Sequence, residues 1–117
     1  MVCMAGEDDK FVKDTDAKRI FKEATQVAKG DKTFFLMHSD RRGKPQQVAG
    51  HLAPLAPPGF VDAHDYFGFW KWLDALMDVA FEGKNREYVL GNTEKARFMG
   101  RWSDGVPIKE PTVLEAP

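Results

Sequence analysis

The sequence predicts an α/β fold, with a small and mostly parallel sheet of two or three strands and two main helices. Two short runs, at residues 1–5 and 33–38, have the unbroken hydrophobicity of parallel strands covered by helices on both faces. An amphipathic segment of helical period separates them, which is the order of a βαβ unit. A second helical segment, at residues 62–83, is the richest in large apolar side chains.

The first strand is predicted at residues 1–5 and is followed by a charged loop at residues 6–10. Because the chain is apolar from its first residue, we expect it to begin inside a fold, with residues 1–117 forming one incomplete domain. A crossover helix should follow, capped by Thr15 or Asp16 and closed by Gly30. It leads to the strand at residues 33–38, and such crossovers are almost always right-handed. The core-facing positions of this helix are Ala17, Ile20, Phe21, Ala24, Val27 and Ala28.

The segment at residues 62–83 is predicted to be a core helix that the rest of the chain packs against. Asp62 or Asp65 can accept hydrogen bonds from the free amides of its first turn, and Gly83 can end it in a left-handed conformation. Lys71, Asp74 and Asp78 fall on the opposite face. The predicted core stripe consists of Tyr66, Trp70, Leu73, Met77 and Phe81, with Phe69, Leu76 and Ala80 beside it.

The remaining segments are expected to be less regular. A proline-rich spacer at residues 54–59 leads into the long helix, and a helical turn at residues 86–90 follows it. Thr93 resembles the cap of another short helix. Beyond residue 100 we expect order to fade into an extended arm, because prolines at 107, 111 and 117 interrupt regular structure.

Composition excludes several classes of function. Seventeen Lys and Arg residues against eighteen Asp and Glu residues leave a net charge of -1, with the two signs interspersed, so we expect no nucleic-acid partner and no membrane surface. The single cysteine, Cys3, excludes an internal disulfide and a cysteine-based zinc cluster. The sequence has no transmembrane segment, and its first residues are too short for a signal peptide. We therefore expect a cytoplasmic protein.

Asp9 and His51 are the residues with the clearest chemical meaning. Each lies in a loop beyond one of the two predicted strands, and the carboxyl ends of parallel strands meet at one edge of a sheet. A carboxylate bonded to one imidazole nitrogen fixes the tautomer, and the other nitrogen can then accept a proton from a nucleophile. Asp8 is an alternative to Asp9 for the acid.

The pattern Gly6-x-x-Asp9-x-x-Val12, followed by an amphipathic helix, an apolar strand and the pair Gly50-His51, resembles the last third of the α/β-hydrolases. The aromatic helix and residues 97–107 also look like those of a bacterial subgroup of this family. The resemblance implies that Asp9 is the acid and His51 the base of a Ser-His-Asp triad.

The family's serine nucleophile lies upstream of the acid, on a G-x-S-x-G elbow, and only eight residues precede Asp9 here. Ser103 is followed two residues later by Gly105, but no strand leads into this segment and its order relative to His51 is reversed. Ser39 lies in a turn before His51 and is an equally weak candidate. The chain therefore resembles a C-terminal portion of a hydrolase that carries no nucleophile.

Other chemistries are less consistent with the sequence. Cys3 could complete a thiol triad with Asp9 and His51, but burial in an apolar strand would raise its pKa and make it unreactive. A metal site built from the three histidines, with Asp62 or Asp65, would need distant segments to converge, and no histidine pair has the helical i, i+4 spacing. We therefore expect neither a metal nor a cofactor. The histidines are His38, His51 and His64.

Two functions are compatible with these features. The first is a remnant or split portion of a serine α/β-hydrolase acting on carboxylic esters, inactive until a partner half supplies the serine. The second is a non-enzymatic interaction module that reuses the half-fold. In both cases a sheet with an open edge favours self-association or a partner chain, and Trp70 or Phe69 should lie near the contact.

Overall fold

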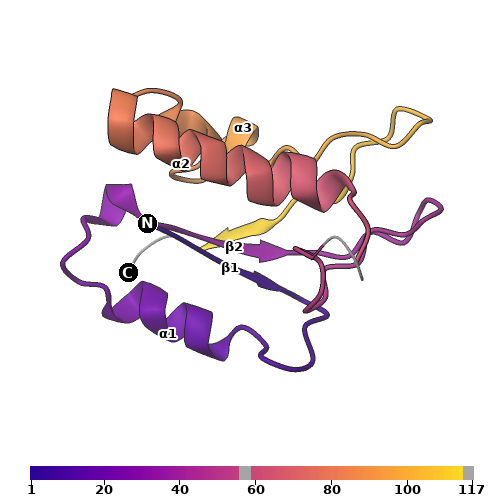
Figure 1. Cartoon of the computed structure of the whole chain (residues 1–117), viewed down its shortest axis with the longest axis horizontal. Helices are drawn as coiled ribbons and strands as arrows, with labels where there is room; N and C mark the ends of the chain where they lie inside the picture. The colour runs from indigo at the N-terminus through magenta and orange to yellow at the C-terminus, as the bar shows by residue number, and fades with distance from the viewer. Residues whose placement is uncertain (56–58, 115–117) are drawn as a thin grey trace.

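The computed structural model describes residues 1–55 and 59–114 of the chain (Figure 1). Part of the predicted proline-rich spacer and the predicted break at Pro117 fall outside these residues. The described residues form one three-layer α/β unit. Figure 1 shows the sheet in the middle layer, with helix α1 (Thr15–Glu23) on one side and helix α2 (Lys71–Glu82) on the other.

The sheet has three strands in the order β1 (Val2–Gly6), β2 (Thr33–Met37) and β3 (Thr112–Leu114). Strands β1 and β2 are parallel, with Cys3 opposite Phe34, and strands β2 and β3 are antiparallel, with Leu36 opposite Thr112. The predicted α/β class, the number of strands and the two main helices are confirmed. The prediction of a mostly parallel sheet is wrong, because one of the two pairings is antiparallel.

Strand β3 belongs to the segment in which order was expected to fade. The Asp40 carboxylate accepts hydrogen bonds from the Trp102 indole at 3.1 Å and from the Lys109 amide at 3.0 Å, which holds this segment against the sheet. Pro107 and Pro111 precede the strand and do not interrupt it, so the backbone amides of β3 remain available for pairing. The expectation that order fades is therefore wrong over residues 100–114, where the arm is extended but held in place.

Helix α1 ends at Glu23, well before the predicted stop at Gly30, and its N-cap is Asp14. The ammonium group of Lys32 donates hydrogen bonds to the carbonyls of Phe21, at 2.8 Å, and Ala24, at 3.1 Å. The Ala24 carbonyl also accepts the Val27 amide at 3.3 Å, whereas the Phe21 carbonyl lies in the last turn of the helix, so Lys32 acts as a C-terminal cap. A turn of 3₁₀ helix, η1 (Lys29–Asp31), then leads into β2.

The second helical segment has the predicted start and stop. The Asp62 amide donates to the Asp65 carboxylate at 2.9 Å, and the His64 amide donates to the Asp62 carboxylate at 2.8 Å, forming a reciprocal capping box. The first turns are π-helical, η2 (Asp65–Trp70), and continue directly into α2. Gly83 ends the helix with φ of 67°.

The face that this helix buries differs from the prediction. Trp72 and Ala75 are buried, and the Trp72 indole stacks on Phe35 with ring centroids 3.9 Å apart and planes 2° from parallel. The wider winding of the π-helical turns shifts the phase of the helix. Gly68 then lets the backbone approach the sheet, since a Cβ there would lie 3.1 Å from Cε of Met37. The predicted core stripe is instead exposed: Tyr66 60%, Trp70 41%, Leu73 56%, Met77 44% and Phe81 84%.

Two short helices follow and support α2. They are η3 (Arg86–Tyr88) and α3 (Glu94–Arg97), and both match predicted segments. Thr93 caps α3 by accepting the Ala96 amide at 3.0 Å, as expected. The half-buried Lys71 side chain donates through its ammonium group to carbonyls at the other end of α3, those of Lys95, Ala96 and Phe98. Lys71, predicted to lie on the exposed face, therefore joins the two helices.

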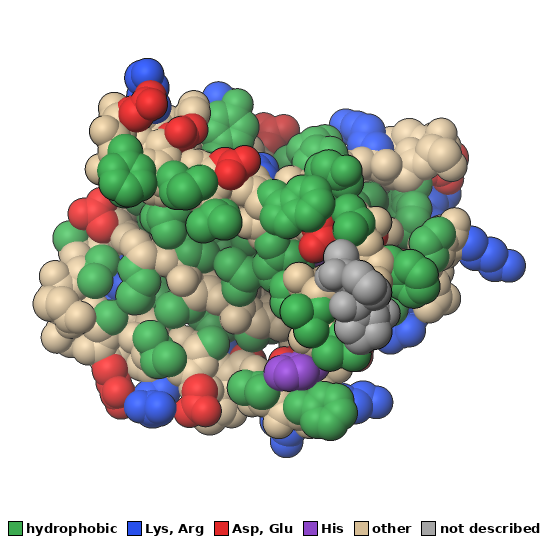
Figure 2. Space-filling view, viewed as in Figure 1, with side chains coloured by type: hydrophobic (Ala, Val, Ile, Leu, Met, Phe, Trp, Pro, Cys, Tyr) green, Lys and Arg blue, Asp and Glu red, His purple; other side chains and the backbone are tan. Residues whose placement is uncertain are grey.

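Strand β1 is only half-buried along its whole length, although a fully covered strand was predicted. Strand β2 pairs with one edge of β1, and no strand among the described residues pairs with the other edge. On the face shown in Figure 2, hydrophobic side chains gather between α2 above and α1 below. Among residues 1–55 and 59–114, no helix is long and apolar enough to cross a membrane.

Candidate functional site

The structure brings Asp9 and His51 together, as predicted from their positions after the strands. Oδ2 of Asp9 lies 3.0 Å from Nδ1 of His51. The Asp9 side chain is only 13% exposed, whereas the His51 side chain is 45% exposed. The carboxylate is therefore shielded by the protein, while the imidazole can reach a molecule outside.

The loop after β1 fixes the Asp9 carboxylate in place. Oδ1 accepts hydrogen bonds from the backbone amides of Phe11 and Val12, both at 3.0 Å. The pKa of Asp9 is lowered to about 2, first by the Val12 amide, then by His51 and the Phe11 amide. Asp9 is therefore ionised at neutral pH, with one oxygen bound to its own loop and the other to His51.

A hydrogen-bonded network joins the Asp9 loop to the His51 loop. The Asp8 amide donates to the Ala49 carbonyl at 3.1 Å, and the Ala49 amide donates to Oγ of Ser39 at 2.9 Å. The Ser39 hydroxyl in turn donates to the Asp8 carboxylate at 2.6 Å. Because both loops share this network, the positions of Asp9 and His51 are coupled through buried Ser39.

Asp8, the alternative acid, binds other groups. Its carboxylate accepts hydrogen bonds from Ser39 and from the Arg41 guanidinium, the latter at 2.8 Å. These two groups lower the pKa of Asp8, with the Ser39 hydroxyl as the larger cause. Of the two neighbouring carboxylates, Asp9 is the one in contact with His51.

Gly6 allows the two loops to approach. A Cβ at this position would lie 2.2 Å from the carbonyl oxygen of Ala49, so any side chain would push the loops apart. Gly50, which precedes the histidine, has more space: a Cβ there would meet its nearest neighbour, Val48, at 3.8 Å. Of the two glycines in the sequence pattern, Gly6 is the one that close packing requires.

A cavity of about 210 Å³ lies beside the Asp9–His51 pair, at the carboxyl ends of β1 and β2. Most of its walls are apolar. The Phe11 ring also contacts the imidazole, at 5.5 Å between centroids, and is itself 84% exposed. The residues that line the cavity are Met4, Ala5, Gly6, Asp9, Met37, Ala49, Gly50, His51, Ala53, Pro54 and Phe69.

The candidate nucleophiles lie elsewhere. Ser39 is buried in the network described above, and Ser103 is exposed in the turn between Arg101 and Pro107. Cys3 is half-buried in β1, and burial raises the pKa of its thiol, as expected. Among residues 1–55 and 59–114, Asp9 is the one hydrogen-bond partner of the His51 ring.

A second imidazole cluster at the same end of the sheet was not predicted. His38, directly after β2, has Nδ1 2.6 Å from the Glu7 carboxylate and Nε2 2.8 Å from the hydroxyl of Thr112 on β3. The other Glu7 oxygen accepts the Ser39 amide at 2.7 Å. The placement of Glu7 and His38 directly after their strands could have indicated this contact, but Thr112 could not have been found without β3. The cluster attaches β3 to the ends of the parallel pair.

The three histidines do not converge on one point. His38 and His51 bind different carboxylates, and His64 is buried, with Nε2 3.2 Å from the His38 carbonyl. No group of three or more His, Cys, Asp or Glu side chains that could hold a metal ion occurs in the part of the chain that the structure describes. The expectation that no metal is bound stays a prediction.

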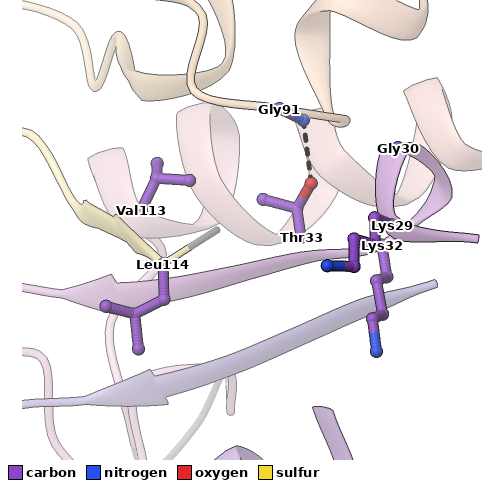
Figure 3. A pocket seen from close by; sticks show the side chains of 7 residues that line it. All are labelled: Lys29, Gly30, Lys32, Thr33, Gly91, Val113 and Leu114. Atoms are coloured by element: carbon purple, nitrogen blue, oxygen red, sulfur yellow. Dashed lines mark hydrogen bonds between the residues drawn. The ribbon is translucent and has the colours of Figure 1, made fainter. Parts of the chain in front are cut away.

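A larger cavity, of about 350 Å³, lies near the start of β2 and the end of β3 (Figure 3). Two of its polar side chains have partners: Oγ1 of Thr33 accepts the Gly91 amide at 2.9 Å, as drawn in Figure 3, and Lys32 caps α1. Lys29 lines the same cavity, and none of its lining residues within 1–55 and 59–114 carries a carboxylate or an imidazole. We therefore place the candidate site at the Asp9–His51 end of the sheet.

No family model, no curated protein and no solved structure matches this chain. The function is accordingly inferred from the geometry of Asp9, His51 and their surroundings.

Proposed function

We propose that this chain supplies the acid and the base of a hydrolytic triad, as a split or remnant portion of a serine α/β-hydrolase that acts on carboxylic esters. The observation that carries the proposal is the 3.0 Å contact between Oδ2 of Asp9 and Nδ1 of His51. An ionised carboxylate at this position favours a proton on Nδ1, which leaves Nε2 able to accept a proton from a hydroxyl nucleophile.

The nucleophile and the oxyanion-binding amides come from outside these 117 residues. In the reaction, the serine hydroxyl would lose its proton to His51 as it attacks the ester carbonyl, and Asp9 would stabilise the imidazolium. The oxyanion donors supply a large part of the rate acceleration in such reactions. The chain alone should therefore hydrolyse esters no faster than free imidazole.

The open edge of β1 supports a partner half. The backbone of β1 has hydrogen-bonding groups on the side away from β2, and its side chains are half-buried. A parallel strand from a serine-bearing partner half would satisfy these groups and cover the exposed side chains. It would also lie next to the strand that leads to Asp9.

The acid–base pair is tested by ¹⁵N NMR of the His51 ring in the neutral form. The proposal predicts a proton on Nδ1, and Asp9→Asn should shift the tautomer ratio because it removes the anionic acceptor. Asp8→Asn is the matched control and should leave the ratio unchanged, since Asp8 binds Ser39 and Arg41. A proton found on Nε2 in the unmodified chain would exclude His51 as the base.

The hydrolytic role is tested by sequencing the DNA upstream of Met1 and expressing the extended protein. The reading frame directly upstream of Met1 should encode a G-x-S-x-G elbow, and the extended protein should hydrolyse p-nitrophenyl acetate. That activity should be lost with His51→Ala and strongly reduced with Asp9→Asn. An extended protein that does not hydrolyse the ester, or whose activity survives His51→Ala, would count against the hydrolytic role.

The exposed stripe on α2 favours a second candidate, a protein-interaction module. Its five large apolar side chains follow one face of η2 and α2, and Trp70 is among them, whereas Phe69 packs against the core. Exposed apolar patches of this kind mark contact surfaces. Loss of partner binding with Leu73→Gln, combined with normal function of Asp9→Asn and His51→Ala in cells, would favour this candidate over the hydrolase.

A further inference from the structure

The cavity beside His51 has the size of a small organic ligand. Engineered apolar cavities of roughly 150 Å³ in other proteins bind benzene and exclude water. The cavity here measures about 210 Å³, so it has room for one aromatic ring, or a short alkyl chain, and one or two further heavy atoms. Met4, Met37 and Phe69 supply most of the large apolar lining.

The polar part of the lining selects the head group of the ligand. Asp9 and His51 are the titratable residues among those that line the cavity, and Asp9 is ionised. Glu7 and Asp8 on the same loop are paired with Lys109 and Arg41, so Asp9 carries the negative charge that faces the cavity. A ligand carboxylate would be repelled by this charge, so an acid is disfavoured.

A cationic head group is disfavoured for a different reason. Both Asp9 oxygens already accept hydrogen bonds, from the Phe11 and Val12 amides and from His51. An ammonium group would lose part of its hydration and would compete with these three donors for the two oxygens. With Nδ1 committed to Asp9, the remaining polar atom is Nε2 of His51, which accepts a hydrogen bond from a neutral donor.

We propose that this cavity binds a small primary alcohol, with the apolar body against Met4, Met37 and Phe69 and the hydroxyl donating to Nε2 of His51. Benzyl alcohol has this chemistry. The inference deepens the proposed function. It rests on that function in one respect only, namely that the proton of neutral His51 is on Nδ1. The cavity and its apolar lining are independent of any hydrolytic reaction.

The test is a titration of the whole chain followed by NMR of the methionine methyl groups. Benzyl alcohol should produce saturable shifts at Met4 and Met37. Toluene, which lacks the hydroxyl, should bind about three- to tenfold more weakly, the range expected for one neutral hydrogen bond. Benzoate should produce no saturable shift. His51→Ala should remove the preference for benzyl alcohol over toluene, because both ligands then lack a hydrogen-bond acceptor at this position.

Two alanine-to-leucine variants show where the ligand binds. Ala53→Leu places a larger side chain in the cavity lining and should abolish binding, whereas Ala80→Leu, on an exposed position of α2, should leave it unchanged. Absence of saturable shifts in the unmodified chain would overturn the proposal, as would equal binding of toluene and benzyl alcohol or unchanged binding in folded Ala53→Leu. In those cases the ¹⁵N tautomer experiment still decides the acid–base role of His51 separately.

Discussion

Asp9 binds His51 with one carboxylate oxygen and its own loop with the other. Oδ2 lies 3.0 Å from Nδ1 of His51, while Oδ1 accepts the amides of Phe11 and Val12. The hydrogen bonds that shape the loop therefore also aim the acid at the base. A substitution that disrupts the contact with His51 should therefore also disturb the contact with the loop amides, and the reverse.

The Asp9 carboxylate should give the protein a specific dependence on acid. Its pKa falls from an ordinary value of 3.8 to about 2 on folding, so its stabilising effect is present above about pH 4 and is lost as pH falls towards 2. We expect Asp9→Asn to have a lower Tm than the unmodified protein at pH 5. The difference should close near pH 2. A difference that stays constant from pH 5 to pH 2 would contradict this assignment.

Gly6→Ala should separate the two loops of the candidate site. The added Cβ would lie 2.2 Å from the Ala49 carbonyl, and the hydrogen bond from Asp8 to Ala49 would be lost as the loops move. We expect changed NMR shifts at His51 and a loss of stability of about 1–3 kcal/mol. Gly50→Ala is the control and should alter neither, because its Cβ has space. Similar effects of the two substitutions would show that Gly6 is not the close contact.

The two tryptophans of the long helix should differ sharply on substitution. Trp72 stacks on Phe35 and donates its indole N–H to the Ala96 carbonyl, so Trp72→Ala should cost about 3–5 kcal/mol. Trp70 is 41% exposed, and Trp70→Ala should cost less than about 1 kcal/mol. Urea denaturation measures both free energies of unfolding. A larger loss of stability for Trp70→Ala than for Trp72→Ala would mean that the helix buries the face predicted from periodicity alone.

Lys71 should stabilise the junction between α2 and α3. Lys71→Met removes the ammonium donor from the carbonyls of Lys95 and Phe98, while that of Ala96 keeps the Trp72 indole, and this should cost about 1–3 kcal/mol in urea denaturation. Lys84→Met removes an exposed ion pair with Glu82 and should cost at most about 1 kcal/mol.

Burial lowers the pKa of Lys71 to about 8, so the folded state releases a proton that the unfolded chain retains. The unmodified protein should therefore gain stability relative to Lys71→Met as pH rises from about 8 to about 10. No change in the difference between the two proteins over this range would refute the lowered pKa.

The exposed stripe on α2 should make the protein self-associate at micromolar concentration, as measured by light scattering. Leu73 is 56% exposed at the centre of the stripe, and Leu73→Gln should shift the protein towards the monomer. Asp74→Gln, on the neighbouring exposed position, should not. A monomer at all concentrations would show that the stripe does not mediate contact between copies of this chain.

The pairing of Asp9 with His51 could be predicted because it depends on topology. Parallel strands end at the same edge of a sheet. Residues directly beyond two such strands therefore lie close to each other, however the side chains pack. The choice between Asp8 and Asp9 could not be predicted, because it depends on which carboxylate turns back to its own backbone. One residue along a loop reverses the direction of a side chain.

The buried face of the long helix could not be predicted from helical periodicity. Five large apolar residues at helical spacing outweigh Gly68 and Ala75 in any count of hydrophobicity, yet the small residues face the sheet. Close approach of the backbone and the stack of Trp72 on Phe35 decide the contact, after π-helical turns have altered the phase. Strand β3 was missed for a related reason, since a distant carboxylate, Asp40, holds its segment in place.

The antiparallel attachment of β3 has a kinetic consequence. Strands β1 and β2 are joined through α1 within residues 2–37, whereas β3 pairs with β2 only after a loop of more than seventy residues closes. Long-range pairings of this kind form late and, when short, open first. Each opening of β3 would expose the outer edge of β2, whose side chains other than that of Leu36 are buried. Amides of β2 that donate to β3 should therefore exchange with solvent deuterium sooner than those that donate to β1.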